Sequence, residues 1–396
     1  MKKKVLFVID SLETAGAEKS LVTLLSLLDY SKMEVDLLLF SHGNPLEELL
    51  PPEVNMLSPL NYSNFAKLSL QAAIIYSLKN KKINMLSSRL SYSLKIRKAK
   101  LSNPQKARLY WESISKVIPT NEKNYDIAIS YAQGIPTFYV AEKIIATKKF
   151  AWVNASLRLK EEDKSFQKQY YDYFQTIVTV SETAKSIFLE TFPDYHSKTK
   201  VIYDITDFNF IKDMAEVDVG YNDSFTGTRI LTIGRIASQK GYDIALEACK
   251  ILKEKGFHFK WYVLGKGPLE EKVKQYIAEN ALSNYFILLG TKTNPYPYIK
   301  QADIYVQTSR YEGYGLAIAE ARMLNVPVVT TRFEAVYNQM VHEKNGLVVD
   351  MAGEAVAEGV VRLLNNPSLT QEIKAYLSKE KKGNREELDK FYELIG

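Results

Sequence analysis

Two glutamates, Glu312 and Glu320, stand eight positions apart in "TSRYEGYGLAIAEARML" (308–324). Gly313 and Gly315 leave the turn between them without side chains, so a ligand could approach its backbone amides. The helix predicted after Gly315 begins with unpaired amides at the positive end of its dipole, which favours a diphosphate. Glu320 could then accept hydrogen bonds from two neighbouring hydroxyls, such as those of a ribose, while Glu312 would face the group that leaves.

A second loop of the same half carries two cations, Arg235 and Lys240, in "GRIASQKG" (234–241). Two cations between a strand and a helix can clamp a diphosphate from the side opposite a helix dipole. Gly265 in "LGKGP" adds a glycine turn, and Thr291 stands in a loop that could line a base. Each pattern alone is more often an ordinary surface feature, so the prediction depends on their occurring together.

Strands and helices alternate along the chain and must bring these loops together. The apolar runs are rich in Val, Ile and Leu without polar alternation, which is typical of a parallel sheet buried on both faces. Strands are expected over 4–9, 35–40, 125–131, 150–154, 176–181 and 200–204, and then over 229–234, 259–265, 285–290, 303–308, 326–331 and 346–350. Ligands bind such sheets at the carboxyl ends of the strands, where the motifs above fall.

A chain of 396 residues is too long for one typical core. The pattern predicts two doubly wound α/β domains and a C-terminal helix that could pack back on the first of them. The expected boundaries are 1–205 for the first domain, 206–227 for a polar linker, 228–377 for the second domain and 378–396 for the helix.

The segment 61–125 interrupts the first domain with apolar residues at helical spacing and a strong positive charge. It holds 13 lysines and arginines against two acidic residues, a net charge of +11, so the rest of the chain is at −5. Solvated helix faces would explain the charge alone, but its alternation with Leu, Ile and Tyr is typical of helices on an anionic membrane surface. No nucleic-acid motif accompanies it, so we expect no nucleic-acid partner.

Composition limits the remaining possibilities. Hydrophobic residues at 46% and charged residues at 25% are ordinary for a globular protein. A lone cysteine, Cys249, fits a reducing cytoplasm, and the first apolar run stops at Asp10, too early for a secretion signal. The four histidines show no metal-ligand spacing and no Asp-x-Asp pair is placed for a metal, so we expect neither a metal nor another cofactor. The expected location is the cytoplasm, with peripheral contact at the inner face of the membrane.

Four motifs together resemble the donor half of glycosyltransferase family 4: "GRIASQKG", "LGKGP", "NPYPYIKQADIYVQTSRYEGYGLAIAEA" and "VPVVTT", in this order and spacing. The resemblance is strong over 229–350 and looser before it. It implies the GT-B fold, two Rossmann-like domains facing across a cleft, and sugar transfer from a nucleotide donor with retention of anomeric configuration. "NPYPYIKQAD" is similar to bacterial enzymes that build capsular and other surface polysaccharides.

The resemblance also implies roles for single residues. Arg235 and Lys240 would bind the donor phosphates and act in catalysis with Glu312, which would lie at the donor sugar, while Glu320 would bind the ribose. Further donor contacts would come from Gly265, Thr291, Gly315 and Leu316. Gly16, in "TAGAEKSL", matches a glycine that lets a loop close over donor phosphate and acceptor.

One position departs from the family pattern. The family often has Trp-Val-His followed two residues later by Asp, whereas this chain has "AWVNASL", with Asn154 and Ser156 at those places. Asn154 can hydrogen-bond a sugar hydroxyl on the acceptor side but cannot exchange a proton near neutral pH. Retaining transfer can proceed without a strong base, because the leaving phosphate can take the acceptor proton while cations and helix amides stabilise its charge.

Three functions remain as hypotheses. The first is a retaining glycosyltransferase that moves a sugar from a nucleotide sugar, with UDP favoured, to a glycan or lipid-linked glycan. The second is a nucleotide-sugar epimerase of the same fold, and the third is a non-catalytic partner subunit, which Asn154 would suit. A degenerate partner should have lost some of the donor residues, but Arg235, Lys240, Glu312 and Glu320 are all present, which favours the first.

Overall fold

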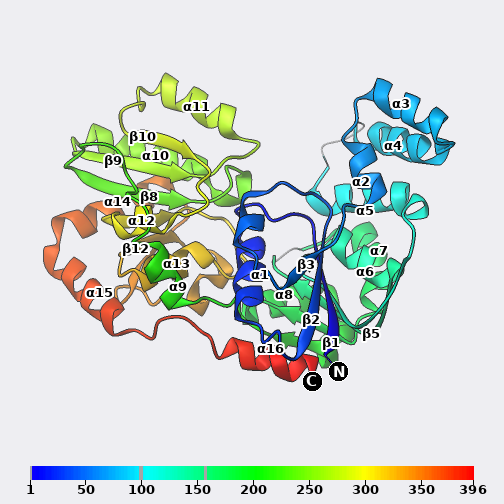
Figure 1. Cartoon of the computed structure of the whole chain (residues 1–396). Coiled ribbons are helices and arrows are strands. Elements are labelled where there is room, and N and C mark those ends of the chain that lie inside the picture. Colours follow the sequence, from blue (N-terminus) through cyan, green and yellow to red (C-terminus); the bar gives the residue numbers. More distant parts are fainter. Residues whose placement is uncertain (1, 98–100, 156–157) are drawn as a thin grey trace. The chain divides into compact units, whose positions relative to one another are not determined.

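The computed structural model describes residues 2–97, 101–155 and 158–396, which form two α/β units (Figure 1). The first unit is built mainly from the chain up to Ile202 together with Phe391–Gly396, and the second mainly from Tyr203–Lys390. Each unit has a parallel sheet with helices packed on it, so the prediction of two doubly wound domains is confirmed.

The first sheet has seven strands in the order β3-β2-β1-β4-β5-β6-β7. Their bounds are β1 (Lys3–Ile9), β2 (Met33–Leu39), β3 (Val54–Met56), β4 (Asn121–Ser130), β5 (Ile144–Val153), β6 (Thr176–Thr179) and β7 (Thr199–Val201). The strand order changes direction between β1 and β4, which places a ligand-binding edge at their carboxyl ends. Among the strands of the described residues, β3, a half-exposed strand of three residues, has no counterpart in the sequence prediction.

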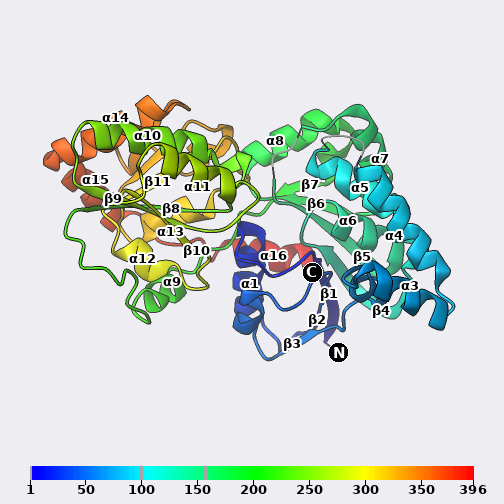
Figure 2. The ribbon, with the colours of Figure 1, turned by 90° about the horizontal axis from the view of Figure 1, so that it is seen from above.

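Helices cover this sheet and a helix from the far end of the chain joins it. The helices are α1 (Gly16–Leu27), α6 (Ile135–Lys143), α7 (Glu161–Tyr171), α8 (Glu182–Thr191) and α16 (Glu387–Ile395). Helix α16 lies near β1 (Figure 2). The ring of Phe391 in α16 stacks 6.2 Å from that of Phe7 in β1, and it lies equally far from that of Trp152 in β5. The last residues of the chain therefore complete the core of the first unit.

Four further helices lie between β3 and β4: α2 (Asn61–Ala66), α3 (Leu70–Lys79), α4 (Ile83–Ile96) and α5 (Asn103–Ile114). Trp111 anchors α5, because its buried ring packs near Phe138 and its Nε1 donates to Glu142 at 2.9 Å. By contrast, α3 and α4 contact each other and lie away from the sheet (Figure 1). They carry exposed apolar side chains at Leu70, Ile74, Ile75, Leu78, Ile83, Leu90, Leu94 and Ile96.

The second sheet has six strands in the order β10-β9-β8-β11-β12-β13. Its strands are β8 (Thr228–Ile233), β9 (Phe259–Leu264), β10 (Phe286–Gly290), β11 (Ile304–Gln307), β12 (Val328–Thr331) and β13 (Gly346–Val349). Its helices are α9 (Phe208–Met214), α10 (Tyr242–Glu254), α11 (Glu270–Glu279), α12 (Tyr296–Lys300), α13 (Leu316–Met323), α14 (Gly353–Asn365) and α15 (Pro367–Lys379). Cys249 belongs to the buried face of α10 and is fully buried in the core, as its helical spacing predicts.

Residues 206–227, expected to be a linker, form part of the second unit. They contain α9, and the ring of Tyr221 lies 4.4 Å from that of Tyr262 in β9. Asp223 accepts hydrogen bonds from Tyr262 Oη at 2.5 Å, Lys260 Nζ at 3.0 Å and Arg229 Nη2 at 3.0 Å. The polar composition of 206–227 indicated a linker, because the few residues that anchor this segment to the second unit are scattered among charged ones.

The Asp223 cluster predicts a pH-dependent contribution to stability. Partial burial alone would raise the pKa of Asp223, but the hydrogen bonds from Tyr262, Arg229 and Lys260 outweigh it and lower the pKa well below 3.8. A lowered pKa stabilises the fold above the ordinary value, and this stabilisation is lost as the pH falls through the folded pKa. At pH 7, Asp223→Asn should therefore lower the free energy of unfolding of the second unit by about 1 kcal/mol, a figure reduced for partial exposure.

Urea unfolding at neutral and acidic pH would measure this effect. The difference from wild type should shrink progressively below about pH 4, where the carboxylate of the unfolded chain becomes protonated. It should vanish only once the pH falls below the lowered pKa of the folded state. Asp213→Asn removes the same charge from an exposed position of α9 and is the control. Equal losses in the two variants, or a loss independent of pH, would contradict the assignment.

Candidate active site

The motif-bearing loops of the second unit meet where its strand order changes direction. Strands β8 and β11 are adjacent and parallel, although they are far apart in the sequence. The loop carrying Arg235 and Lys240 leaves the carboxyl end of β8, and the loop carrying Glu312 leaves that of β11. A crevice for a ligand forms at such a switch point because the two connections run to opposite faces of the sheet.

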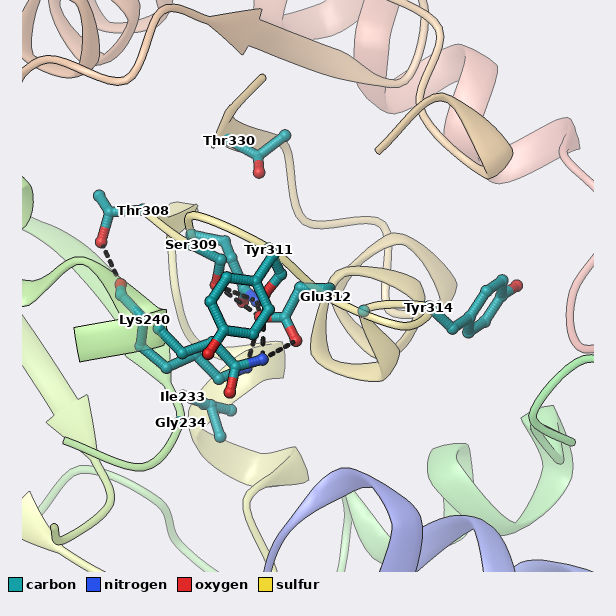
Figure 3. Close-up of polar contacts among 12 residues, drawn as sticks. Ile233, Gly234, Lys240, Thr308, Ser309, Tyr311, Glu312, Tyr314 and Thr330 are labelled. Atoms are coloured by element: carbon teal, nitrogen blue, oxygen red, sulfur yellow. Dashed lines mark hydrogen bonds and ion pairs between the residues drawn. The ribbon is translucent and has the colours of Figure 1, made fainter. Parts of the chain in front are cut away.

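Lys240 and Glu312 form an ion pair at this point (Figure 3). The Nζ atom of Lys240 lies 2.6 Å from Oε1 of Glu312. The same oxygen accepts from Ser309 Oγ at 2.5 Å and from Gln307 Nε2 at 2.8 Å. Gln239 Nε2 approaches the other oxygen at 3.4 Å, and only 8% of Glu312 is exposed. The carboxylate is therefore held in one orientation by groups from both loops.

A glycine allows these loops to come so close. Gly241 has φ +62°, and a Cβ there would lie 2.0 Å from the carbonyl oxygen of Thr308. The hydroxyl of Thr308 donates to the carbonyl of Lys240 at 2.8 Å. Arg310 adds a second connection, since it donates to the carbonyl of Ser238 and pairs with Asp243 at 2.5 Å. The backbone of Lys240 is thus fixed against the loop that carries Glu312.

Sequence reasoning did not identify the side chains of β11 that orient Glu312. Tyr305, fully buried in β11, donates to Oε1 of Gln307 at 2.6 Å, so the amide nitrogen of Gln307 faces Glu312. Burial raises the pKa of Tyr305 well above 10, which keeps its hydroxyl a donor. The available signal was the polar ending of an otherwise apolar strand, "IYVQTS", where Gln307 and Ser309 interrupt the apolar run.

Gly315 and Leu316 lie where the helix α13 begins. Gly315 has φ +94°, and its carbonyl and that of Tyr314 accept from Gln339 Nε2 at 3.1 and 2.6 Å. Leu316 is the first helical residue and is buried. The amide end of α13 therefore points to the carboxyl edge of the sheet, beside the Lys240–Glu312 pair.

Glu320 lies one turn further along α13 and is 3% exposed. Its Oε1 accepts from the hydroxyl of Tyr296 in α12 at 3.2 Å. Burial, followed by the charge of Glu320, raises the pKa of Tyr296 well above 10, so the phenol remains a donor. Tyr296 belongs to "NPYPYIKQAD", in which only the prolines were given a structural role from sequence.

The other predicted donor residues lie at the same edge but do not contact the ion pair. Arg235 is exposed, and within the described ranges its side chain has no hydrogen bond or ion pair. Gly265 has φ +148°, and a Cβ there would lie 2.1 Å from the carbonyl oxygen of Gly234. Gly265 thus lets the ends of β8 and β9 approach each other. Thr291 is exposed in the loop after β10.

The first unit presents its own polar groups at the carboxyl edge of its sheet. Gly16, the first residue of α1, is grouped with the second unit and contributes no side chain to this edge. Asn154 follows β5 and donates from Nδ2 to the carbonyl of Tyr131 at 2.5 Å. Its Oδ1 is buried and has no hydrogen-bond partner among the residues that the structure describes. Ser156, the other departure from the family pattern, lies outside those residues.

Asp10 at this edge was also missed by sequence reasoning. It directly follows β1, which pairs with β4, and β4 in turn pairs with β5. Its side chain keeps some contact with solvent, yet desolvation by the surrounding protein raises the pKa of its carboxyl to about 7. A carboxyl with such a pKa can accept or release a proton near neutral pH, which Asn154 cannot do.

Comparison with known proteins shows which family and which relatives this chain resembles. Residues 224–380 match the family described as "Glycosyl transferases group 1". The amylovoran biosynthesis glycosyltransferase AmsK of Erwinia amylovora is 32% identical over 144 residues, which are 34% of this chain and 35% of AmsK. The N-acetylgalactosamine-N,N'-diacetylbacillosaminyl-diphospho-undecaprenol 4-alpha-N-acetylgalactosaminyltransferase of Campylobacter jejuni is 27% identical over 186 residues, 46% of this chain and 48% of that protein. The chain thus spans less than half the length of these curated relatives.

The likeness in fold extends further than the likeness in sequence. A variant of TarM from S. aureus, in complex with fondaparinux, alpha-GlcNAc-glycerol and UDP, superimposes with a TM-score of 0.68 at 14% identity, over 100% of both chains. At this identity the comparison concerns the fold alone, and it confirms the GT-B prediction.

The close approach at Gly241 can be tested by substitution. Gly241→Ala introduces a left-handed alanine, which costs about 1–2 kcal/mol, and also a clash with the carbonyl of Thr308, which should add about 1–3 kcal/mol. Gly256→Ala is the matched control, because Gly256 has φ +76° and open space around its Cβ position. Chemical unfolding should show the larger loss for Gly241→Ala, and equal losses would mean that the loops are not held together there.

Proposed function

We propose that this chain, whose residues 224–380 are a glycosyl transferases group 1 domain, is a retaining glycosyltransferase of family 4 that acts in polysaccharide biosynthesis. Its donor would be a nucleotide sugar, with UDP favoured, and its acceptor a glycan or a lipid-linked glycan. The observation that carries the proposal is the Lys240–Glu312 pair, fixed at a topological switch point beside the amide end of α13. The names of AmsK and the C. jejuni relative, and the UDP in the TarM complex, support it.

The donor would bind along the edge of the second sheet. An ammonium group has three N–H donors, and Lys240 uses one on Glu312, so the others could bind a phosphate oxygen. Arg235 and the first amides of α13 would hold the same diphosphate from other sides. Glu320 would bind the ribose, with Tyr296 keeping its carboxylate in place, and Glu312 would accept from hydroxyls of the donor sugar.

Transfer would then proceed on one face of the donor sugar. The bond from the anomeric carbon to the diphosphate oxygen breaks, and a bond from the same carbon to the acceptor oxygen forms on the same side. The acceptor proton passes to the leaving phosphate oxygen, whose charge Lys240 and Arg235 stabilise. No metal is required for these steps, because cations and helix amides neutralise the leaving group.

Removing donor ligands should separate binding from chemistry. Glu320→Ala should weaken UDP binding by about 1.5–3 kcal/mol, a tenfold to hundredfold loss in affinity by calorimetry. Lys240→Ala should lower kcat by about 10²–10³-fold for release of nucleotide from a panel of nucleotide sugars. Glu358→Ala and Lys272→Ala change exposed residues of α14 and α11 and are the controls. Unchanged UDP affinity in Glu320→Ala would remove the ribose role.

We also propose that the protein attaches peripherally to an anionic membrane at the cytoplasmic face. Ile75, Leu78 and Leu94 of α3 and α4 are 65%, 66% and 59% exposed, and basic residues surround them. Exposed apolar side chains gathered on paired helices are typical of an interaction surface. Within the described ranges, no helix is long and apolar enough to cross a bilayer.

The charges expected to serve this surface are only partly described. Lys95 lies 3.6 Å from Glu112, so part of its charge is already balanced, and Arg97 is exposed at the end of α4. Lys98 and Lys100 lie outside the described residues. The exposed aliphatic side chains therefore provide the sharper test.

Replacing Ile75, Leu78 and Leu94 together by serine should release the protein from anionic vesicles. Each aliphatic side chain buried at an interface contributes about 1.5–3 kcal/mol, so the loss should exceed tenfold in sedimentation with phosphatidylglycerol-containing vesicles. Wild-type binding should also weaken with salt. Val217→Ser with Val219→Ser changes side chains of the second unit that are 72% and 70% exposed and is the control. Failure of wild type to sediment at low salt would refute membrane attachment.

A further inference from the structure

A pocket of about 460 Å³ lies within the first unit, between the inserted helices and the carboxyl edge of its sheet. Phe40 lines it from the end of β2 and Ile135 from the start of α6. The helices contribute Lys67 at the end of α2, Tyr92 from α4, and Lys106 and Tyr110 from α5. None of the donor-site residues takes part in it.

The lining of the pocket contains aromatic rings that pack firmly on one another and on neighbouring rings. The rings of Tyr92 and Tyr110 meet edge to face at 5.0 Å, and Phe40 packs edge to face on Tyr139 at 5.5 Å. Burial is the main cause that raises the pKa of Tyr92 above 10, so its hydroxyl is a neutral donor. These aromatic residues offer apolar surface together with phenolic hydroxyls, which suits an amphiphilic ligand.

The lining of the pocket also contains two cationic residues. Lys67 and Lys106 come from different helices, and both are exposed. Within the part of the chain that the structure describes, neither takes part in an ion pair or a side-chain hydrogen bond, and no acidic residue lines the pocket. Two lysine ammonium groups in the lining of one pocket, neither of them in an ion pair, attract an anion with several acceptor oxygens, such as a phosphate or a diphosphate.

The inserted helices place the pocket close to two other features of the first unit. Helix α4 supplies Tyr92 to the pocket, while Leu90 and Leu94, each two residues from Tyr92, are exposed on the opposite face of the same helix. Tyr110 of α5 also lines the pocket. Burial is the main reason that its pKa is raised, and the charge of Asp10 raises it further. This residue of the pocket lining therefore lies within electrostatic range of Asp10, which follows the carboxyl end of β1.

We infer that this pocket binds the phosphate end of a lipid-linked acceptor, in which a phosphate or diphosphate joins an apolar chain to the sugar to be extended. The apolar chain packs on the rings of Phe40, Tyr92 and Tyr110, Lys67 and Lys106 bind the phosphates, and the sugar extends toward the carboxyl edge of the sheet. The inference rests on the proposed function and deepens it, because it selects the lipid-linked acceptor over a free glycan.

Binding of three probes to the full chain would test the inference by calorimetry below the micelle concentration: farnesyl diphosphate, farnesol and inorganic pyrophosphate. Farnesyl diphosphate should bind at least tenfold more tightly than either of the others, because only it offers both the chain and the anion. Lys67→Gln with Lys106→Gln should weaken its binding at least tenfold. Lys79→Gln with Lys116→Gln removes the same charge from exposed positions of the insertion outside the pocket and should leave it unchanged.

Each other outcome would overturn the inference. If pyrophosphate bound as tightly as farnesyl diphosphate, the pocket would be a site for free phosphate. If farnesol bound as tightly, the pocket would recognise only the apolar chain. Equal losses in the two double variants would show general attraction by the basic surface. UDP affinity, measured in parallel, reports on the donor site of the second unit, so failure of the proposed glycosyl transfer would appear there and not in the farnesyl diphosphate titration.

Discussion

The second unit depends on one close approach of backbone to backbone, that of Gly241 to the carbonyl of Thr308. Strands β8 and β11 are neighbours because the sheet reverses its strand order between them, and their loops can meet only if one loop has no side chain at the contact. Once they meet, the carbonyl of Lys240 accepts from Thr308 and the ammonium reaches Glu312. The position of the catalytic candidates is thus a consequence of topology and of one glycine.

Stability alone does not account for what this approach brings together. Removing a lysine and a glutamate from water is costly, and apolar residues of similar size are often as stabilising or more so. Here one carboxylate oxygen accepts from three side chains, and a fully buried tyrosine fixes the amide that is one of those donors. Forming this ion pair and its hydrogen bonds at the carboxyl edge of a parallel sheet costs free energy. Binding of a ligand by these groups explains their presence better than stability does.

The sequence predicted the parts of the fold that depend on local pattern. Unbroken apolar runs marked all the strands except β3, and glycine-rich loops marked the two connections that meet at the site. What it missed depends on side-chain direction and on distant partners. Nothing local shows that Tyr296 would face Glu320, or that Asp223 would gather Tyr262 and two cations, so 206–227 resembled a linker.

The two sheet edges differ in how completely their polar groups are satisfied. In the second unit, Oε1 of Glu312 accepts from three side chains, which fixes the orientation of the carboxylate and preorganises its other oxygen for one chemistry. In the first unit, Oδ1 of Asn154 and Oγ of Ser130 are buried without hydrogen-bond partners among the described residues. A buried polar atom without a partner costs about 1–3 kcal/mol, so such atoms persist where something else supplies the bond. Under the proposed function, the preorganised edge of the second unit would suit the diphosphate of the donor, and the edge of the first unit, with its polar atoms unsatisfied within the described residues, would suit the hydroxyls of the acceptor.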